Sequence, residues 1–277
     1  MRLDLDGDGT ATIKESLGSI LQSIQTAPAQ QESEQLPPLT VTFDDADVVW
    51  LAGYCHMLSA MAEMVLAYDW EDQFERTAHL FYPKVDSPYE FLEAEGPGPF
   101  MGFGVQNILD LLAWIHTINY EVTGADRMKS ALAHMETVIA LSRRNWELIE
   151  AETDDDQEWV PNPNQTAALP GLQVARGVVT GWHEFLEEVE AILQGKKLIP
   201  FWRGIVPAGS DFPTNPKLGI NVRRVFTEPT RFDFVLWLQG TGLLPYLEEG
   251  DIIDSAEWQE MMSRFQGQFF NFALWFN

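Results

Sequence analysis

Residues 48–68 read VVWLAGYCHMLSAMAEMVLAY and carry a single formal charge, on Glu63. The run is long enough to cross a bilayer. His56, Glu63 and the preceding Asp47 dilute its apolar character, and no Lys or Arg flanks it, which argues against a membrane span. A helix that is apolar all round is better explained as the central helix of a globular bundle. Glu63 would then be a buried or half-buried carboxylate that needs a partner.

This central helix has a start signal. Asp44 is a good N-cap residue, and Asp47 follows it three positions later. Apolar spacing predicts further helices at 71–82, 107–122, 125–153, 171–194 and 255–276. The aromatic side chains of the last of these must dock into the body or a partner.

Residues 198–250 have a different character, because prolines recur through them. Within this segment the alternation over 219–226 predicts a short strand. The predicted fold class is therefore mainly α: a multi-helix bundle with a small irregular region containing little strand, plus an N-terminal calcium loop and helix.

Composition limits the partners. The 277 residues include 17 basic and 42 acidic ones, for a net charge of −25. This charge argues against nucleic acid and against anionic membranes as the main partner, and it fits a salt-rich or extracytoplasmic setting. The lone Cys55 excludes an intrachain disulfide, and its apolar surroundings predict a small buried side chain.

The N-terminus carries the sharpest chemical signal. Residues 4–15 read DLDGDGTATIKE, which is the pattern D-x-D-x-D-G-x₅-E of a calcium loop. Calcium is a hard cation that takes six to eight oxygen ligands, and this spacing supplies them in order along the loop. Gly9 stands where the loop turns sharply. The predicted metal ligands are Asp4, Asp6, Asp8, Thr10, Thr12 and Glu15.

This stretch resembles the EF-hand family over residues 4–15 and the helix that follows, to about residue 26. Only three residues precede the loop, Ala11 replaces the usual larger aliphatic residue, and no second loop follows. The arrangement is therefore more similar to the loop-then-helix modules of dockerin-type proteins than to a sensor pair. The resemblance implies calcium as the cofactor, in a structural role.

The domain prediction follows from these features: a calcium-binding loop and helix at 1–26, a linker rich in Gln, Glu and Pro at 27–40, and a helical domain at 41–277. No signal peptide is recognisable in the chain as given. Because millimolar calcium occurs outside the cytoplasm, we expect a periplasmic or extracellular location.

Two charged segments stand out in the body. The run 154–158 (DDDQE) could hold a second cation, but its spacing matches no known loop, so a solvated charge run is favoured. Between residues 195 and 231, basic residues outnumber acidic ones. Guanidinium and aromatic groups there suit an anionic ligand, although salt bridges to the acidic helices are the favoured alternative. The candidate anion-binding residues are Arg203, Arg223, Arg224, Arg231 and Trp202.

Catalytic motifs are mostly missing from the sequence. The five histidines form no H-E-x-x-H, and no G-x-S-x-G occurs. Two i, i+4 pairs, Glu75/His79 and His183/Glu187, could build a metal centre only if they faced each other.

The predicted function is a non-enzymatic, calcium-stabilised, exported protein that binds a small anionic ligand or a protein partner.

The alternative function is a hydrolase acting on a saccharide or other polar polymer through paired carboxylates. Such a pair would lie near the irregular region. The candidate residues for it are Trp202, Trp237, Asp211 and Asp233.

Overall fold

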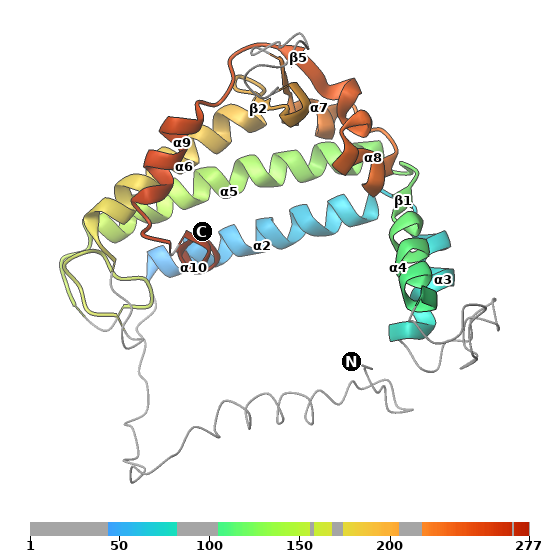
Figure 1. Ribbon diagram of the computed structural model, residues 1–277. Coiled ribbons are helices and arrows are strands. Elements are labelled where there is room, and N and C mark those ends of the chain that lie inside the picture. The colour runs from blue at the N-terminus through green and yellow to red at the C-terminus, as the bar shows by residue number, and fades with distance from the viewer. Residues whose placement is uncertain are drawn as a thin grey trace, which may run out of the picture. The chain divides into compact units, whose positions relative to one another are not determined.

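The computed structural model describes six segments of the chain: residues 44–81, 105–155, 158–167, 174–204, 218–267 and 269–276. The calcium loop at 4–15 and the linker at 27–40 lie outside these segments. The described residues form a mainly α structure with a few short strands, which confirms the predicted fold class (Figure 1).

The chain divides into two compact units. The described residues of the small unit fall within Asp69–Tyr120 and Asp233–Val235, and those of the large unit fall within Leu39–Tyr68, Glu121–Phe232 and Leu236–Asn277. The small unit contains α3 (Glu71–Phe81), α4 (Val105–Thr117) and β1 (Asn119–Tyr120). The chain passes between the units after Tyr68 and after Tyr120, and again within β4 (Phe232–Asp233) and α8 (Phe234–Gln239).

The large unit is built on helices. They are α2 (Asp45–Leu66), α5 (Ala125–Ala151), α6 (Arg176–Leu193), α7 (Val222–Thr227), α9 (Ser255–Ser263) and α10 (Phe269–Phe276). The shorter elements are β2 (Ile199–Pro200), β3 (Leu218–Ile220), β5 (Leu247–Glu249) and the 3₁₀ helices η2 (Trp202–Gly204) and η3 (Thr241–Tyr246).

Helix α2 begins where the sequence predicts. The Asp44 carboxylate accepts hydrogen bonds from the backbone N–H groups of Ala46 (2.7 Å) and Asp47 (3.2 Å), and the Asp47 carboxylate accepts one from the Asp44 backbone (3.2 Å). This reciprocal capping box satisfies N–H groups that have no partner within the helix.

Helices α2 and α5 lie side by side (Figure 1). The α2 residues buried against this neighbour include a small residue at every seventh position: Ala46, Gly53, Ala60 and, just past the helix end, Ala67. Small side chains let two helix backbones approach closely. Glu63 finds its predicted partner on α5, because Arg127 Nη1 lies 2.8 Å from Glu63 Oε2.

The core of the large unit is aromatic. Trp146 on α5 and Trp182 on α6 are buried, and Phe272 on α10 packs against both, with ring centroids 5.8 Å and 5.2 Å away. Phe265, between α9 and α10, is also buried. The prediction that the aromatic C-terminal segment docks into the body is thus confirmed for Phe265 and Phe272.

Four predictions about local structure are wrong. The helix expected over 107–122 ends at Thr117, and β1 follows at Asn119–Tyr120. The segment 255–276 forms two helices, α9 and α10, because the backbone turns through positive φ at Gln266 (50°) and Gly267 (82°). The alternating stretch 219–226 is a strand only to Ile220; Asn221 then caps α7 by accepting a hydrogen bond from Arg224 N (3.3 Å). Cys55, expected to be buried, is exposed.

A small antiparallel sheet completes the large unit. Strand β3 lies between β2 and β5, with Ile220 opposite Ile199 on one side and opposite Leu247 on the other. Ile220 packs with Phe201, Leu243 and Tyr246 in a second, smaller core cluster.

Candidate metal centre

The antiparallel pairing of α2 and α5 brings the start of one helix to the end of the other. Glu63 near the end of α2 pairs with Arg127 near the start of α5. Nearer the start of α2, the Nδ1 atoms of His56 and His134 lie 2.8 Å apart. Continued in the same sense, the N-cap of α2 lies opposite the C-cap of α5, which is Glu152.

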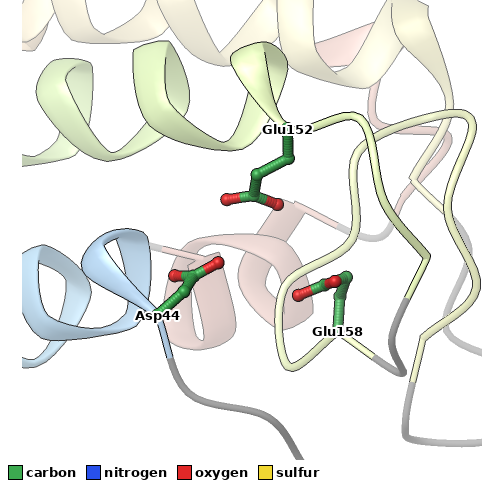
Figure 2. A group of neighbouring side chains, drawn as sticks. All are labelled: Asp44, Glu152 and Glu158. Atoms are coloured by element: carbon green, nitrogen blue, oxygen red, sulfur yellow. The ribbon is translucent and has the colours of Figure 1, made fainter.

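Three carboxylates meet at this corner of the large unit (Figure 2). They come from Asp44, Glu152 and Glu158, and one oxygen of each lies within 4.8 Å of the other two. In Figure 2 the three side chains point toward one another from the start of α2, the end of α5 and the following loop. We call these three residues the carboxylate cluster.

Asp44 caps α2 and is also a member of the carboxylate cluster. Its Oδ1 is engaged in capping α2. The partial positive charge at a helix N-terminus favours a carboxylate at this position. Asp44 is therefore held in place by the helix that it starts.

Glu152 is in a less favourable place for a negative charge. It caps the C-terminus of the 27-residue helix α5, where the helix dipole is negative. Burial, which is the largest cause, and the nearby carboxylates of Asp44 and Glu158 together raise the pKa of its carboxyl to about 7, against a hydrogen bond donated by Gln165 (3.1 Å). These neighbours are anionic or neutral, so a proton or a cation would relieve the repulsion.

Glu158 is the buried member of the cluster, with a relative exposure of 6%. Its backbone N–H donates to Thr166 O (3.3 Å), and a bridge joins it to Ala167, so the loop 158–167 closes on itself. The same loop is tied to the end of α5, because Asn162 Nδ2 donates to Ile149 O (3.1 Å). Hydrogen bonds within the protein therefore hold Glu158 in position without an ion.

The geometry suits one hard cation. Two oxygens bound to one calcium ion, each about 2.4 Å from it, are at most roughly 4.8 Å apart, and the cluster oxygens lie within that limit. Carboxylate oxygens are the ligands preferred by Ca²⁺ and Mg²⁺. The alternative is a proton shared between Glu152 and Asp44, which the raised pKa of Glu152 also permits.

The predicted calcium ligands are not described. Asp4, Asp6, Asp8, Thr10, Thr12 and Glu15 all lie in the segment before residue 44, so that site stays a prediction. The acidic run 154–158 is described in part. Asp154 and Asp155 are exposed, as a solvated run requires, but the burial of Glu158 contradicts that interpretation for the last residue of the run.

The arginines of the candidate anion site are engaged with the protein. Arg223 pairs with Glu136 on α5 (3.0 Å), Arg224 with Glu228 (2.8 Å) and Arg231 with Glu121 (2.9 Å). Arg203 donates to the backbone oxygen of Gln239, and Trp202 is 42% exposed beside Phe201. The anion site at these residues stays a prediction.

The other sequence candidates are only partly described. The side chain of His79 and the whole of Asp211 lie outside the described residues. Asp233 accepts a hydrogen bond from Asn119 (2.9 Å) within the small unit, and Trp237 packs in the large unit against Tyr246 (6.1 Å between ring centroids).

A polar cleft of about 370 Å³ lies beside the loop 158–167. One wall is the tip of that loop and the other is α6. The lining residues are Glu150, Asn162, Pro163, Asn164, Arg176, Val179, Thr180 and His183. Among them Arg176 Nη2 reaches Asn164 Oδ1 at 3.4 Å, a long and weak contact.

Sequence reasoning missed Glu152 as a member of the carboxylate cluster and Arg176 as a residue of the cleft. The sequence held no signal for Glu152, because only the tertiary pairing of α2 with α5 brings this C-cap glutamate to the N-cap aspartate. Comparison of the chain with protein-family models, with curated proteins and with solved structures finds no match.

Proposed function

We propose that this chain is a calcium-binding helical protein in which the ion is structural and organises a binding site for a small anionic ligand. The observation that carries the proposal is a shared loop. The segment 158–167 contributes Glu158 to the carboxylate cluster and Asn162, Pro163 and Asn164 to the polar cleft. An ion that fixes one end of this loop also fixes a wall of the cleft.

The sequence also supports calcium as the bound ion. The loop at 4–15 matches every ligand position of an EF-hand-type calcium site. A chain with a net charge of −25 gains stability from divalent cations, because they neutralise carboxylates that repel one another. Since calcium is abundant outside the cytoplasm, we propose an exported protein.

The cleft suits an anionic ligand through its donors. Arg176 offers a planar guanidinium that can bind a carboxylate or phosphate with two hydrogen bonds, and its side chain is exposed at the cleft. His183 and Thr180 add further donors on the same helix, with Glu150 as the one acidic lining residue. The volume of about 370 Å³ falls in the range of small-molecule sites.

The test is a thermal-shift experiment on the full chain with citrate, without calcium and at a fixed concentration of free calcium that allows for the calcium bound by citrate itself. We expect calcium alone to raise the Tm, with stabilisation of about 2.7 kcal/mol per site at 100 times the Kd. We expect citrate to raise it further only when calcium is present. Arg176→Ala should abolish the citrate effect and keep the calcium effect. Glu158→Gln should weaken both.

Two results would overturn the proposal. One is a Tm that does not respond to calcium. The other is a citrate response that is equal in Arg176→Ala and in the unmodified chain, which would remove the cleft from the account.

One observation favours the alternative hydrolase function. A second groove, of about 180 Å³, lies between α6 and α9. Its polar and aromatic lining residues are Glu184, Glu187, Glu188, Asp254, Glu257 and Trp258. Glu184 and Glu188 pair with Arg264 and Lys197. The pair Glu187 and Glu257 would then act as acid and base. Release of reducing ends from soluble polysaccharides, lost in Glu187→Gln and Glu257→Gln, would support this function.

A further inference from the structure

The exposed face of α2 has an unusual pattern. Six positions along it are exposed and apolar or small, and they alternate at spacings of three and four residues: Val48, Leu51, Cys55, Leu58, Ala62 and Val65. Their larger members are more exposed than buried, as Val48 (66%) and Leu58 (60%) illustrate. This is the a/d repeat of a coiled coil, which we call the α2 seam.

The positions that flank the seam are also uncharged. They are Ala52, Tyr54, Ser59, Met61 and Leu66. The one charged residue between Val48 and Leu66 is Glu63, which is engaged with Arg127 on the α5 side. In a chain with a net charge of −25, a helix face of this length without charge is an exception, and it removes the repulsion that would otherwise keep two copies apart.

The α2 seam suits another helix better than a bilayer. By length and composition α2 could cross a membrane. However, its opposite face is packed on α5, whose surface carries exposed charged residues such as Lys129 and Glu147. A bilayer would have to bury those charges as well. A spacing of 3.5 residues on one face is the repeat that keeps a helix in contact with a second helix.

We propose that the α2 seam is a dimer interface, in which α2 of one copy pairs antiparallel with α2 of a second copy of this chain. A two-fold axis near the middle of the seam makes any such surface self-complementary. The antiparallel register sets Leu58 against Cys55 of the second copy and Leu51 against Ala62, so each of these layers combines one large and one small side chain. A parallel pair would instead put Cys55 on Cys55 and Ala62 on Ala62, and it would align the acidic starts of both helices.

Sedimentation of the full chain at micromolar concentration tests the interface. We expect the unmodified chain to have twice the mass of 31.4 kDa, and Leu51→Glu and Leu58→Glu to be monomers with unchanged helical content. The matched control is Leu238→Glu on α8, which adds the same charge at a leucine that is 63% exposed and lies outside the seam. This control should stay dimeric.

A monomeric unmodified chain, or seam variants that remain dimers, would overturn the proposal. Flotation of the unmodified chain with phosphatidylcholine vesicles would also overturn it, because lipid would then be the occupant. Cross-linking tests the register: mild oxidation should link Leu58→Cys into covalent dimers through Cys55 of the second copy. Equally efficient linking in the unmodified chain would contradict the antiparallel arrangement.

Discussion

Glu152 is the residue on which the carboxylate cluster depends most. It is placed at the negative end of α5, beside two other carboxylates, and its pKa is raised to about 7. A carboxyl in this situation is unstable in its ionised form without a counter-charge. Below neutral pH a bound proton can neutralise the Glu152 carboxylate, and above neutral pH a bound cation can. Proton and calcium should therefore compete at the same oxygens.

This competition predicts a specific pH dependence. Because the folded-state pKa of Glu152 lies above its ordinary value of 4.5, the folded state binds the proton more tightly, and stability falls as pH rises from about 4.5 to about 7. Solvent screening of this partly exposed group limits the loss to on the order of 1 kcal/mol. The measurement is urea unfolding in EDTA across this pH range. The fall in unfolding free energy with rising pH should be smaller in Glu152→Gln. An equal fall in both proteins would contradict the assignment of this pH dependence to Glu152.

Two substitutions of Asp44 separate its two tasks. Asparagine keeps the N-cap but removes the charge, whereas alanine removes both. In EDTA at neutral pH we expect Asp44→Ala to be about 1 kcal/mol less stable than Asp44→Asn, because only the alanine variant loses the cap. Calcium should stabilise both variants less than the unmodified chain. Equal stability of the two variants would show that the cap contributes nothing.

At the scale of elements, the sequence predicted where α2 begins but not which of its faces is buried. Local chemistry at Asp44 and Asp47 determines where the helix begins, so sequence alone was sufficient. A helix that is apolar all round gives no signal for which face is buried. The residues packed on α5 are small ones such as Gly53 and Ala60, while the larger Leu58 stays exposed.

The errors at 219–226 and 255–276 have a common cause. In both segments an apolar pattern continues across a residue that changes the backbone direction. Asn221 starts a helix by capping it, and Gly267 takes up a positive φ that ends one. Such signals involve single residues, so a pattern averaged over a window does not detect them.

A buried hydrogen bond joins α5 to α6, because Trp182 Nε1 donates to Ser142 Oγ (2.9 Å). Ser142→Ala leaves the indole N–H without this acceptor and should cost about 1–2 kcal/mol. The matched control is Thr137→Ala, which also removes a hydroxyl from α5, but one that hydrogen-bonds to the backbone near the surface. Chemical unfolding should show a smaller loss of unfolding free energy for the control. Equal losses in the two variants would show that the Trp182–Ser142 hydrogen bond contributes no more than a surface one.

At the scale of the whole molecule, the carboxylate cluster could not be predicted, because Asp44 lies far along the chain from Glu152 and Glu158. The sequence identified Asp44 as a cap and Glu158 as part of an acidic run. It contained no information on the α2–α5 register, which depends on tertiary packing. The N-terminal calcium loop is the opposite case, since all its ligands lie within twelve consecutive residues.

Calcium titration of the full chain by calorimetry tests the central claim most directly. We expect two sites in the unmodified chain, one in Glu15→Gln, one in Glu158→Gln and none in the double variant. Removing one carboxylate from a site of this kind removes a charge and a ligand together, so the loss should be clear. Absence of binding heat in the unmodified chain, or the same number of sites in all four proteins, would contradict it.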